Sequence, residues 1–533
     1  MGSLSLLDRP PGTRIHRVNL VGLSVDSQGV SLHPSREQNQ IRQTVLIVSL
    51  LSLFALAVQG FHPYAEDGGL YVAGIKKMLD PSLYNVRPEF VLAPLRFSPF
   101  APTLAGISRM SHLPLPWVLL GLYAASIWGT LFGGWMVVSR CTASLTARYG
   151  AISLLACWLS IPIAGTSLML MDPYVTARSL STPLTLFAIA WAMDTLTGSW
   201  RSGILCAIAL TLAVVHPLMA TYALTTVVVL LLLGSQREVV RRWGPFLFGG
   251  FIILVAAIVQ AASPYESPHY VMAVLTRAYW FPLQWQWYEL FGLLAPIALL
   301  VLVGRAFEAK CWRLLTQTVI TLGVLSVVIA LCFSRASLST HLVARLQPLR
   351  CFQIVYEVMI LLLGAWLGDR WLKRKPWRWA LMLTILGGVM FASQRSTYPE
   401  SAHFEWPGVV PQNLWSQAFL WIRDNTPKDA LFALDANYIS QDSEDAQSFR
   451  SIAERSVLPD YSKDGGETSI TPRLADAWFE GETAQTGLDT ENDGAREAKL
   501  QPLGVEWVVL RRNSLTAWVC PYENVMVKVC ALP

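Results

Sequence analysis

Acidic side chains are scarce through most of this 533-residue chain. Residues 1–393 carry 15 Asp and Glu against 29 Lys and Arg, whereas residues 394–533 carry 21 against 12. Charged residues make up only 14% of the sequence, while apolar residues make up 53% and 21 residues are tryptophan. This composition argues against an ordinary soluble protein and predicts a basic membrane unit followed by an acidic soluble tail.

Other features are missing as well. Basic residues sit in short loops between apolar runs, so nucleic-acid binding has no support. No short apolar core lies near Met1, so we expect no cleavable signal peptide. Six of the eight cysteines lie in or beside apolar runs, where a cysteine is most often a small core residue. Cys520 and Cys530 flank a hairpin-like stretch of the tail and could form a disulfide if the tail lies outside the cytoplasm.

Apolar runs of spanning length recur along the membrane unit. They predict about eleven transmembrane helices, at 43–60, 114–138, 147–165, 180–196, 203–216, 217–234, 244–262, 287–304, 314–333, 348–367 and 377–393. The His216-Pro217 step could separate two spans or kink one. The predicted parts are an N-terminal arm (1–42), a transmembrane unit (43–393) with a long first outer loop (61–113), and a soluble domain (394–533).

The basic residues also predict the orientation of the spans. With the N-terminal arm inside, every second loop is basic, as the positive-inside rule requires. These loops carry Arg140 and Arg148, then Arg201, then Arg237, Arg241 and Arg242, then Arg305, Lys310 and Arg313, then Arg370, Lys373, Arg374, Lys375 and Arg378. An odd number of spans then places the tail outside. We expect a bacterial inner (plasma) membrane, with the N-terminus cytoplasmic and the tail periplasmic.

The tail reads as a small mixed α/β domain. An amphipathic helix is predicted over Trp415–Arg423, and strand-like runs cover 430–434, 503–510 and 525–529. We find no metal cluster, phosphate loop or nucleophile motif in its sequence. The expected fold class is therefore an α-helical polytopic membrane protein with a small C-terminal α/β extracytoplasmic domain.

Two adjacent carboxylates, Glu66 and Asp67, follow the first predicted span directly. Charge beside a bilayer is costly and usually has a function, although a solvated helix cap in a surface loop would give the same pattern. The apolar residues that follow recur at helical spacing over Tyr71–Leu79, with Lys76 and Lys77 on the other face. This spacing predicts an amphipathic helix at the membrane surface.

Further polar residues gather in the predicted outer loops and at the span ends on the same side. They are Asp172, Arg178, His216, His269, Arg277, Arg335, His341, Arg345 and Arg350. Guanidinium groups bind phosphate through paired hydrogen bonds, and a carboxylate can take a proton from a hydroxyl, so the set suits a phosphate-bearing lipid donor. Structural roles stay open, because Asp172 precedes a proline, His216 could cap or kink a helix, and interfacial arginines bind lipid headgroups.

A resemblance to a known family begins at the acidic pair. The stretch from Asp67 to Leu79 resembles the Asp-Glu-x-x-Tyr…Met-Leu stretch of the GT-C superfamily of polytopic glycosyltransferases, in its mannosyl- and aminoarabinose-transferase branch. In that register Asp67 takes the position of the catalytic-type aspartate and Glu66 precedes it. Gly68 stands where the family has a glutamate, so the order of the acidic pair is reversed. Strings in the tail, such as Arg423–Pro427, look like those of uncharacterised bacterial members of the same group.

The resemblance implies inverting transfer of a sugar from a polyprenyl-phosphate-linked donor on the outer face of the membrane. Asp67 would be the general base, with Glu66 as the other carboxylate of the pair, and Asp172 would hold a metal or position substrate. Some families of the superfamily use a divalent metal and others do not, so a metal at Asp67 and Asp172 stays open. Expected partners are the lipid-linked donor, membrane lipids and an acceptor of unassigned class. The residues expected to bind the donor are Lys76, Arg178, His216, Arg277, Arg335, His341, Arg345 and Arg350.

Two other functions compete with this one. A transporter or flippase would use the carboxylates and the outer arginines along a substrate path, but transporters tend to place ionisable groups within spans and often carry internal repeats. Here Asp194 and Glu357 are the main candidates inside spans, and no repeat is visible. A non-catalytic assembly factor would use the acidic tail to bind a partner and would not depend on Asp67.

Overall fold

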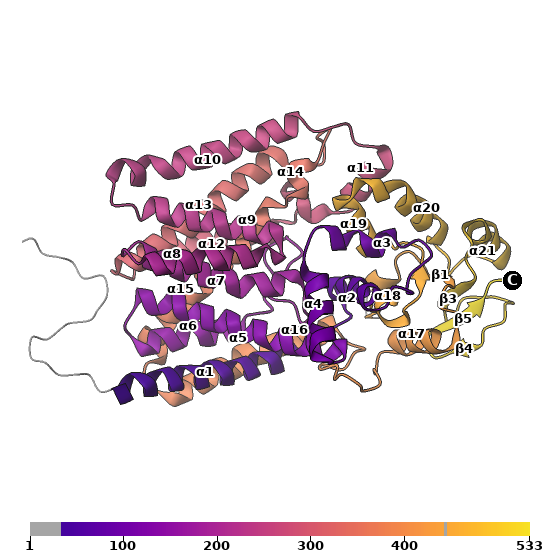
Figure 1. The fold of residues 1–533 in the computed structure, drawn as a ribbon, viewed down its shortest axis with the longest axis horizontal. Coiled ribbons are helices and arrows are strands. Elements are labelled where there is room, and N and C mark those ends of the chain that lie inside the picture. Colours follow the sequence, from indigo (N-terminus) through magenta and orange to yellow (C-terminus); the bar gives the residue numbers. More distant parts are fainter. Residues whose placement is uncertain (1–33, 442–444) are drawn as a thin grey trace, which may run out of the picture.

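The computed structural model describes residues 34–441 and 445–533, so most of the predicted N-terminal arm lies outside the described residues. Long, roughly parallel helices form a bundle on one side of Figure 1, and a smaller part with the described strands lies on the other. The short helices α2 (Glu66–Leu79), α3 (Glu89–Leu92) and α4 (Phe100–Ser111) lie at the end of the bundle that faces the strands. We call this the sheet-domain end.

A helix is present in each of the eleven ranges that the apolar runs indicate. These helices are α1 (Pro34–Gln59), α5 (Leu115–Cys141), α6 (Leu145–Cys157), α7 (Ala177–Thr195), α8 (Trp200–Leu212), α9 (Pro217–Leu233), α10 (Glu238–Ala261), α12 (Trp287–Gly304), α13 (Lys310–Phe333), α15 (Phe352–Leu367) and α16 (Pro376–Thr397). Six helical stretches of the described chain are long and apolar enough to cross a membrane, as in an integral membrane protein. The other helices are shorter or less apolar, and length and composition alone do not assign them as spans.

Two helix boundaries differ from the prediction, and a third decides an alternative that the sequence left open. The first helix already begins at Pro34. α6 ends at Cys157, before the predicted limit of 165, because the apolar residues after it, among them Leu159 and Ile163, are buried in an irregular loop. At His216-Pro217 the chain forms two separate helices, since Pro217 is the first residue of α9, where its missing N–H costs nothing.

The predicted amphipathic helix of the first outer loop is present as α2. Its buried residues include Val72, Ala73 and Ile75, and the helix packs on α4 and on α18 (Phe449–Ala453). The face of α2 that points away from the bundle is therefore covered by helix α18 of the strand-containing part. α2 is enclosed between the bundle and the strand-containing part, instead of lying open on the membrane surface as the sequence suggested.

Residues 414–533 form the small α/β unit expected for the tail, which we call the sheet domain. Its strands are ordered β2-β1-β3-β5-β4 in one sheet, in which β1 pairs in parallel with β2 and β3 while β5 pairs antiparallel with β3 and β4. The strands are β1 (Leu431–Ala433), β2 (Ser456–Val457), β3 (Trp507–Arg511), β4 (Tyr522–Glu523) and β5 (Val527–Ala531).

Side chains alternate between the two faces of this sheet, as the period of two in a strand requires. Phe432 and Val509 pack on one face with α17 (Leu414–Asn425) and α18, while Leu431 and Leu510 pack on the other with residues of α20 and α21. The remaining helices of the domain are α19 (Lys463–Ile470), α20 (Ala475–Gln485) and α21 (Asp493–Leu500). The sequence indicated α17, β1, β3 and β5. It missed β2 and β4, because two residues are too few to show a pattern.

Cys520 and Cys530 are joined by a disulfide, the pairing that the sequence left open. The bond ties the segment before β4 to strand β5.

Removing this bond is expected to loosen the sheet domain. We expect Cys520→Ser to lower its free energy of unfolding by about 2–3 kcal/mol, because the bond closes a short loop of the unfolded chain. Thermal unfolding in detergent, with and without reductant, measures the loss. Cys332→Ser, at an exposed free cysteine, is the control. An unchanged melting temperature for the Cys520 variant in the absence of reductant would contradict the expectation.

Candidate functional site

The acidic pair forms the start of α2. Glu66 and Asp67 are its first two residues, where the positive end of the helix dipole favours carboxylates. Glu66 has a φ of 49°, in the left-handed region that residues other than glycine seldom adopt and that often marks functional sites. The two side chains are 49% and 53% exposed, so the pair is open to solvent at the sheet-domain end.

Gly68 and Gly69 allow α2 to approach its neighbours closely. A Cβ atom at Gly68 would lie 3.0 Å from the ring of Tyr174, and one at Gly69 would lie 2.2 Å from the Cβ of Ser448. Tyr174 belongs to the loop that carries Asp172, and Ser448 directly precedes α18. Gly68 takes the position where the resembling family has a glutamate, and here a Cβ atom would fit only if the Tyr174 ring or the Pro63 carbonyl moved slightly.

Asp172 and Arg178 form a buried ion pair beside α2. Asp172 lies in the loop between α6 and α7, and Arg178 is the second residue of α7. The Arg178 guanidinium donates to the Asp172 carboxylate and, at 2.6 Å, to the carbonyl oxygen of Met169. Burial raises the pKa of Asp172, and the positive charge of Arg178 offsets only part of this effect.

Two further predicted residues face the same carboxylates. Arg350 lies in the short helix η5 (Pro348–Cys351), and its positive charge acts on Asp67, Asp172 and His216. Within the described chain, the buried Nε of Arg350 has no hydrogen-bond partner. His216 caps α9 by accepting a backbone N–H through Nδ1 at 3.3 Å. The structure thus brings together Asp67, Asp172, Arg178, His216 and Arg350.

The sheet domain contributes a residue to this cluster that the sequence did not indicate. Lys463, the first residue of α19, forms an ion pair with Glu66, and its Nζ lies 3.3 Å from Oδ1 of Asp67. The protein around the half-exposed Asp67 removes part of its water and so opposes its ionisation. The charges of Lys463, Arg350 and Arg178 outweigh this effect and hold the pKa of Asp67 below its usual range.

Glu467 follows Lys463 one turn later on α19. Its carboxylate is buried, accepts from the Thr471 hydroxyl at 3.1 Å and lies within electrostatic reach of Asp67, and burial raises its pKa to about 7. The helix that carries both residues reads Lys-Asp-Gly-Gly-Glu-Thr-Ser-Ile. Two glycines and no apolar repeat gave no reason to predict a helix there, so neither residue could be placed from the sequence.

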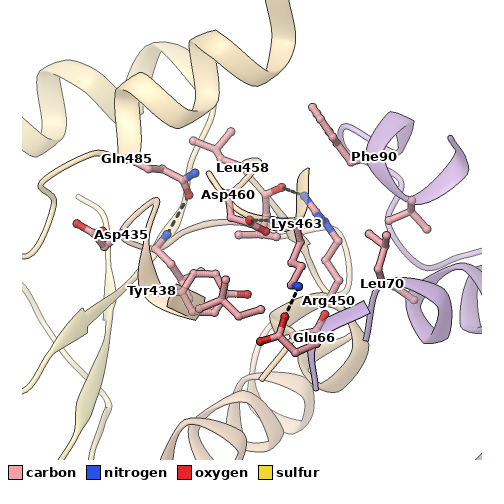
Figure 2. Close-up of a pocket in the computed structure, with 16 residues that line it drawn as sticks. Glu66, Leu70, Phe90, Asp435, Tyr438, Arg450, Leu458, Asp460, Lys463 and Gln485 are labelled. Carbon is pink, nitrogen blue, oxygen red and sulfur yellow. Dashed lines mark hydrogen bonds and ion pairs between the residues drawn. The ribbon is translucent and has the colours of Figure 1, made fainter. Parts of the chain in front are cut away.

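Figure 2 shows a small cavity lined by residues of α2 and of the sheet domain, Glu66 and Lys463 among them. Lys463 points across it toward Glu66. Arg450, which also lines the cavity, donates to the Asp464 carboxylate at 2.7 and 2.9 Å. The cavity volume is about 20 Å³, room for about one water molecule. A sugar does not fit in it, so it is an interface cavity and not a substrate site.

The other predicted donor-binding residues have different partners. Arg277 and Arg345 donate to backbone carbonyls that flank or end α19. Lys76 donates to Glu454 of the sheet domain at 2.6 Å. His341 pairs with Glu266 at 2.7 Å, and Arg335 donates to a backbone carbonyl of α13. Four of these residues thus link separate elements, whereas the Arg335 bond is local to the end of α13, and within the described chain these contacts join none of the five to the cluster around Asp67.

The carboxylates of the cluster do not fit a divalent metal in this arrangement. Asp67 faces the Lys463 ammonium, and Asp172 accepts from the Arg178 guanidinium. Among the described residues, no three His, Cys, Asp or Glu side chains are placed to share an ion. A cation would reach Asp67 only if Lys463 moved away.

Breaking the buried pair is expected to destabilise the sheet-domain end. We expect Arg178→Met to lower the free energy of unfolding by about 3–5 kcal/mol, because Asp172 is then buried without a partner. Asp172→Asn in the same chain should recover part of this loss. Melting temperatures in detergent are measured for Arg178→Met, for Asp172→Asn and for the double variant. Arg140→Met, which breaks the more exposed pair with Asp194, is the control. Purely additive losses at Asp172 and Arg178 would contradict a coupled pair.

Comparisons with known proteins find no matching family model and no matching curated protein. Among solved structures, oligosaccharyltransferase AglB of Archaeoglobus fulgidus matches in several forms. Its complex with an inhibitory peptide and a dolichol-phosphate has a TM-score of 0.46 and 12% identity, and the match covers 87% of this chain and 69% of that one.

Two other forms of the archaeal enzyme match similarly. The form tethered to an acceptor peptide and the complex with Zn and sulfate each have a TM-score of 0.45 and 11% identity, covering 87% of this chain and 68% of that one. These oligosaccharyltransferases belong to the GT-C superfamily, which the sequence around Asp67 resembles. At this identity and TM-score no residue role or activity passes from them to this chain, whose function rests on its own side chains.

Proposed function

We propose that this protein is a membrane glycosyltransferase that moves a sugar from a polyprenyl-phosphate-linked donor to an acceptor at the sheet-domain end of its bundle. One observation carries the proposal. The half-exposed carboxylate Asp67 lies within electrostatic reach of Arg350, whose buried Nε has no partner in the described chain. A carboxylate that can accept a proton, beside an unsatisfied phosphate-binding group, is the combination that transfer from a sugar phosphate requires.

In the proposed reaction, Asp67 takes the proton of the acceptor nucleophile as that atom forms a bond to the anomeric carbon. The bond from the anomeric carbon to the phosphate oxygen breaks, and its electron pair leaves with the lipid phosphate. The configuration at carbon is inverted. Arg350 binds the departing phosphate, whose charge increases in this step. Because its pKa is held low, Asp67 is ionised at neutral pH, as a base must be.

A lipid-linked donor suits the position of this cluster. Apolar side chains such as Phe246, Leu247 and Phe251 are exposed along α10, as expected for a helix that faces lipid. The cluster lies where that bundle meets the sheet domain, so a lipid phosphate at the membrane surface is within its reach. The basic loops predicted to be cytoplasmic would then lie at the opposite end, which puts the reaction on the extracytoplasmic face. The disulfide in the sheet domain suits an oxidising compartment on that face.

Transport of a lipid-linked or anionic substrate is a second candidate, and one observation favours it. Arg178 lies 3.5 Å from Gln353, which in turn lies 3.4 Å from the fully buried Glu357 inside α15. This polar chain leads from the cluster into the bundle, where ionisable groups often mark a substrate path. A transporter would depend on Glu357, whereas the proposed transferase would depend on Asp67.

Loss of Asp67 is expected to remove sugar transfer. Asp67→Asn keeps the shape of the side chain but cannot accept a proton, so we expect transfer from polyprenyl-phosphate sugars to fall by about 10²–10⁴-fold. Radiolabelled donor and isolated membranes provide the assay. Asp194→Asn, at a carboxylate paired with Arg140, is the matched control and should keep its activity.

The outcomes separate the competing functions. Loss in Glu66→Gln but not in Asp67→Asn would move the base to Glu66. Full transfer in both would remove the acidic pair from the chemistry. Loss of substrate movement in Glu357→Gln, with no transfer in the wild type, would support a transporter. If cellular function is lost when the sheet domain is removed but kept in Asp67→Asn, the protein would be a non-catalytic assembly factor.

Arg350 is expected to act on donor binding. Replacing it with glutamine removes a charged hydrogen bond to phosphate, so we expect KM for the donor to rise about 10–100-fold. Initial rates over a range of donor concentrations measure this change. Arg335→Gln, at an exposed arginine bound to its own helix, should leave KM unchanged. Equal KM values for the two variants would contradict a role for Arg350 in binding phosphate.

A further inference from the structure

α19 of the sheet domain is fixed to the bundle at both of its ends. Arg277 donates to the two backbone carbonyls directly before Lys463, at 2.8 and 3.3 Å. The Tyr270 hydroxyl and the Arg345 guanidinium donate to the last two carbonyls of α19, at 2.9 and 3.3 Å. These donors come from residues near or within α11 (Pro268–Leu275) and α14 (Leu342–Arg345) of the membrane unit. The position of Lys463 is therefore set by the bundle and not by the sheet domain alone.

α19 and α2 face each other with matched spacing. Lys463 and Glu467 are four residues apart on α19, and Asp67 and Tyr71 are four residues apart on α2, so each pair lies on one side of its helix. Lys463 meets the acidic pair, and Glu467 acts electrostatically on Asp67 and Tyr71. The Lys463 side chain is 18% exposed, so its charge is little screened by water.

We propose that Lys463 is a positioning residue of the same site, whose ammonium group, paired with Glu66 and Asp67, places a positive charge beside Asp67 and fixes the direction of its carboxylate. This role rests on the proposed function of Asp67. A lysine from the sheet domain then completes the charge balance of a site that is otherwise built by the membrane unit. It also gives the sheet domain a part in the reaction, which the sequence of the tail does not indicate.

A purely structural role would look like that of Lys76. Lys76 lies on the same helix α2 and pairs with Glu454 of the sheet domain at 2.6 Å, with a side-chain exposure of 15%. It joins the same two parts of the molecule at nearly the same burial, but its partner is not a carboxylate of the acidic pair. Lys76→Met is therefore a matched control for loss of an interdomain ion pair.

Removing the positive charge of Lys463 is expected to raise the pKa of Asp67. Asp67 acts in its ionised form, so its activity falls as pH falls through its pKa. Without the ammonium, the neighbouring Glu66 and the burial of Asp67 favour the protonated form, while Arg350 and Arg178 still oppose it. The acid limb of the rate profile should therefore move to higher pH. The charged and titratable groups around Asp67 are Glu66, Tyr71, Asp172, Tyr174, Arg178, His216, Arg350, Lys463 and Glu467.

The test compares Lys463→Met, Lys463→Arg and Lys76→Met in the full chain. The pH dependence of sugar transfer is measured first. Labelling of Asp67 by a carbodiimide, which reacts with protonated carboxyl groups, is then followed against pH by peptide mass spectrometry, and this readout needs no activity. We expect both pH midpoints to rise by about one pH unit or more in Lys463→Met. They should stay near the wild-type values in Lys463→Arg and Lys76→Met.

Each result decides between the roles. Unchanged midpoints in Lys463→Met, with a loss of thermal stability equal to that of Lys76→Met, would reduce Lys463 to an interdomain contact and overturn the proposal. If the labelling midpoint shifts in Lys463→Met but the wild-type protein itself transfers no sugar, Lys463 acts on Asp67 and the proposed glycosyltransferase function is rejected. A shift in Lys76→Met of the same size would also overturn the proposal, because the effect would then not depend on contact with the pair.

Discussion

The close packing of α2 is the constraint on which the rest of the site depends. At Gly68 the helix touches the ring of Tyr174 from the loop of Asp172, and at Gly69 it touches Ser448 of the sheet domain. A side chain at either position would push one neighbour away, and an interior packed to crystal-like density has no slack to absorb that shift. The two glycines therefore set the distances among three separate segments. Lys463, which pairs with both carboxylates at the start of the same helix, belongs to the sheet domain that α2 meets at Gly69.

Charge within the cluster is balanced, but its members are satisfied to different degrees. Asp172 and Arg178 are both buried and bind each other, which is the arrangement expected of a pair that shapes its surroundings. Asp67 is half exposed and meets cations from the bundle and from the sheet domain, while the buried Nε of Arg350 has no hydrogen-bond partner among the described residues. The solvent-accessible carboxylate and the unpaired donor thus lie on the side of Asp67 and Arg350. That asymmetry gives Asp67 the reactive role in the proposed chemistry and leaves Asp172 to hold its loop.

Patterns that repeat within a segment were readable from the sequence, and contacts between distant segments were not. Apolar length indicated the positions of the bundle helices, and helical spacing indicated α2. Strand-like apolar runs indicated β1, β3 and β5. The polar residues expected on one side included the four that meet around Asp67. They also included Lys76, Arg277, Arg345, His341 and Arg335, because residue type does not reveal a partner. Lys463 was missed since it enters the site from more than 390 positions away, on a glycine-containing helix without an apolar repeat.

The backbone also separates the two carboxylates, which the sequence distinguished only through the family register. Glu66 has a positive φ and lines the small cavity on the sheet-domain side, where its carboxylate binds Lys463. Asp67, one residue later in the helix, is the member of the pair that interacts electrostatically with Arg350 and Arg178 of the bundle. Consecutive residues of a helix point about 100° apart, so one carboxylate can anchor the lysine while the other faces the bundle. The strained residue therefore fits best as the anchor, and in the proposed reaction Asp67 is the carboxylate left to take the acceptor's proton while Arg350 binds the phosphate.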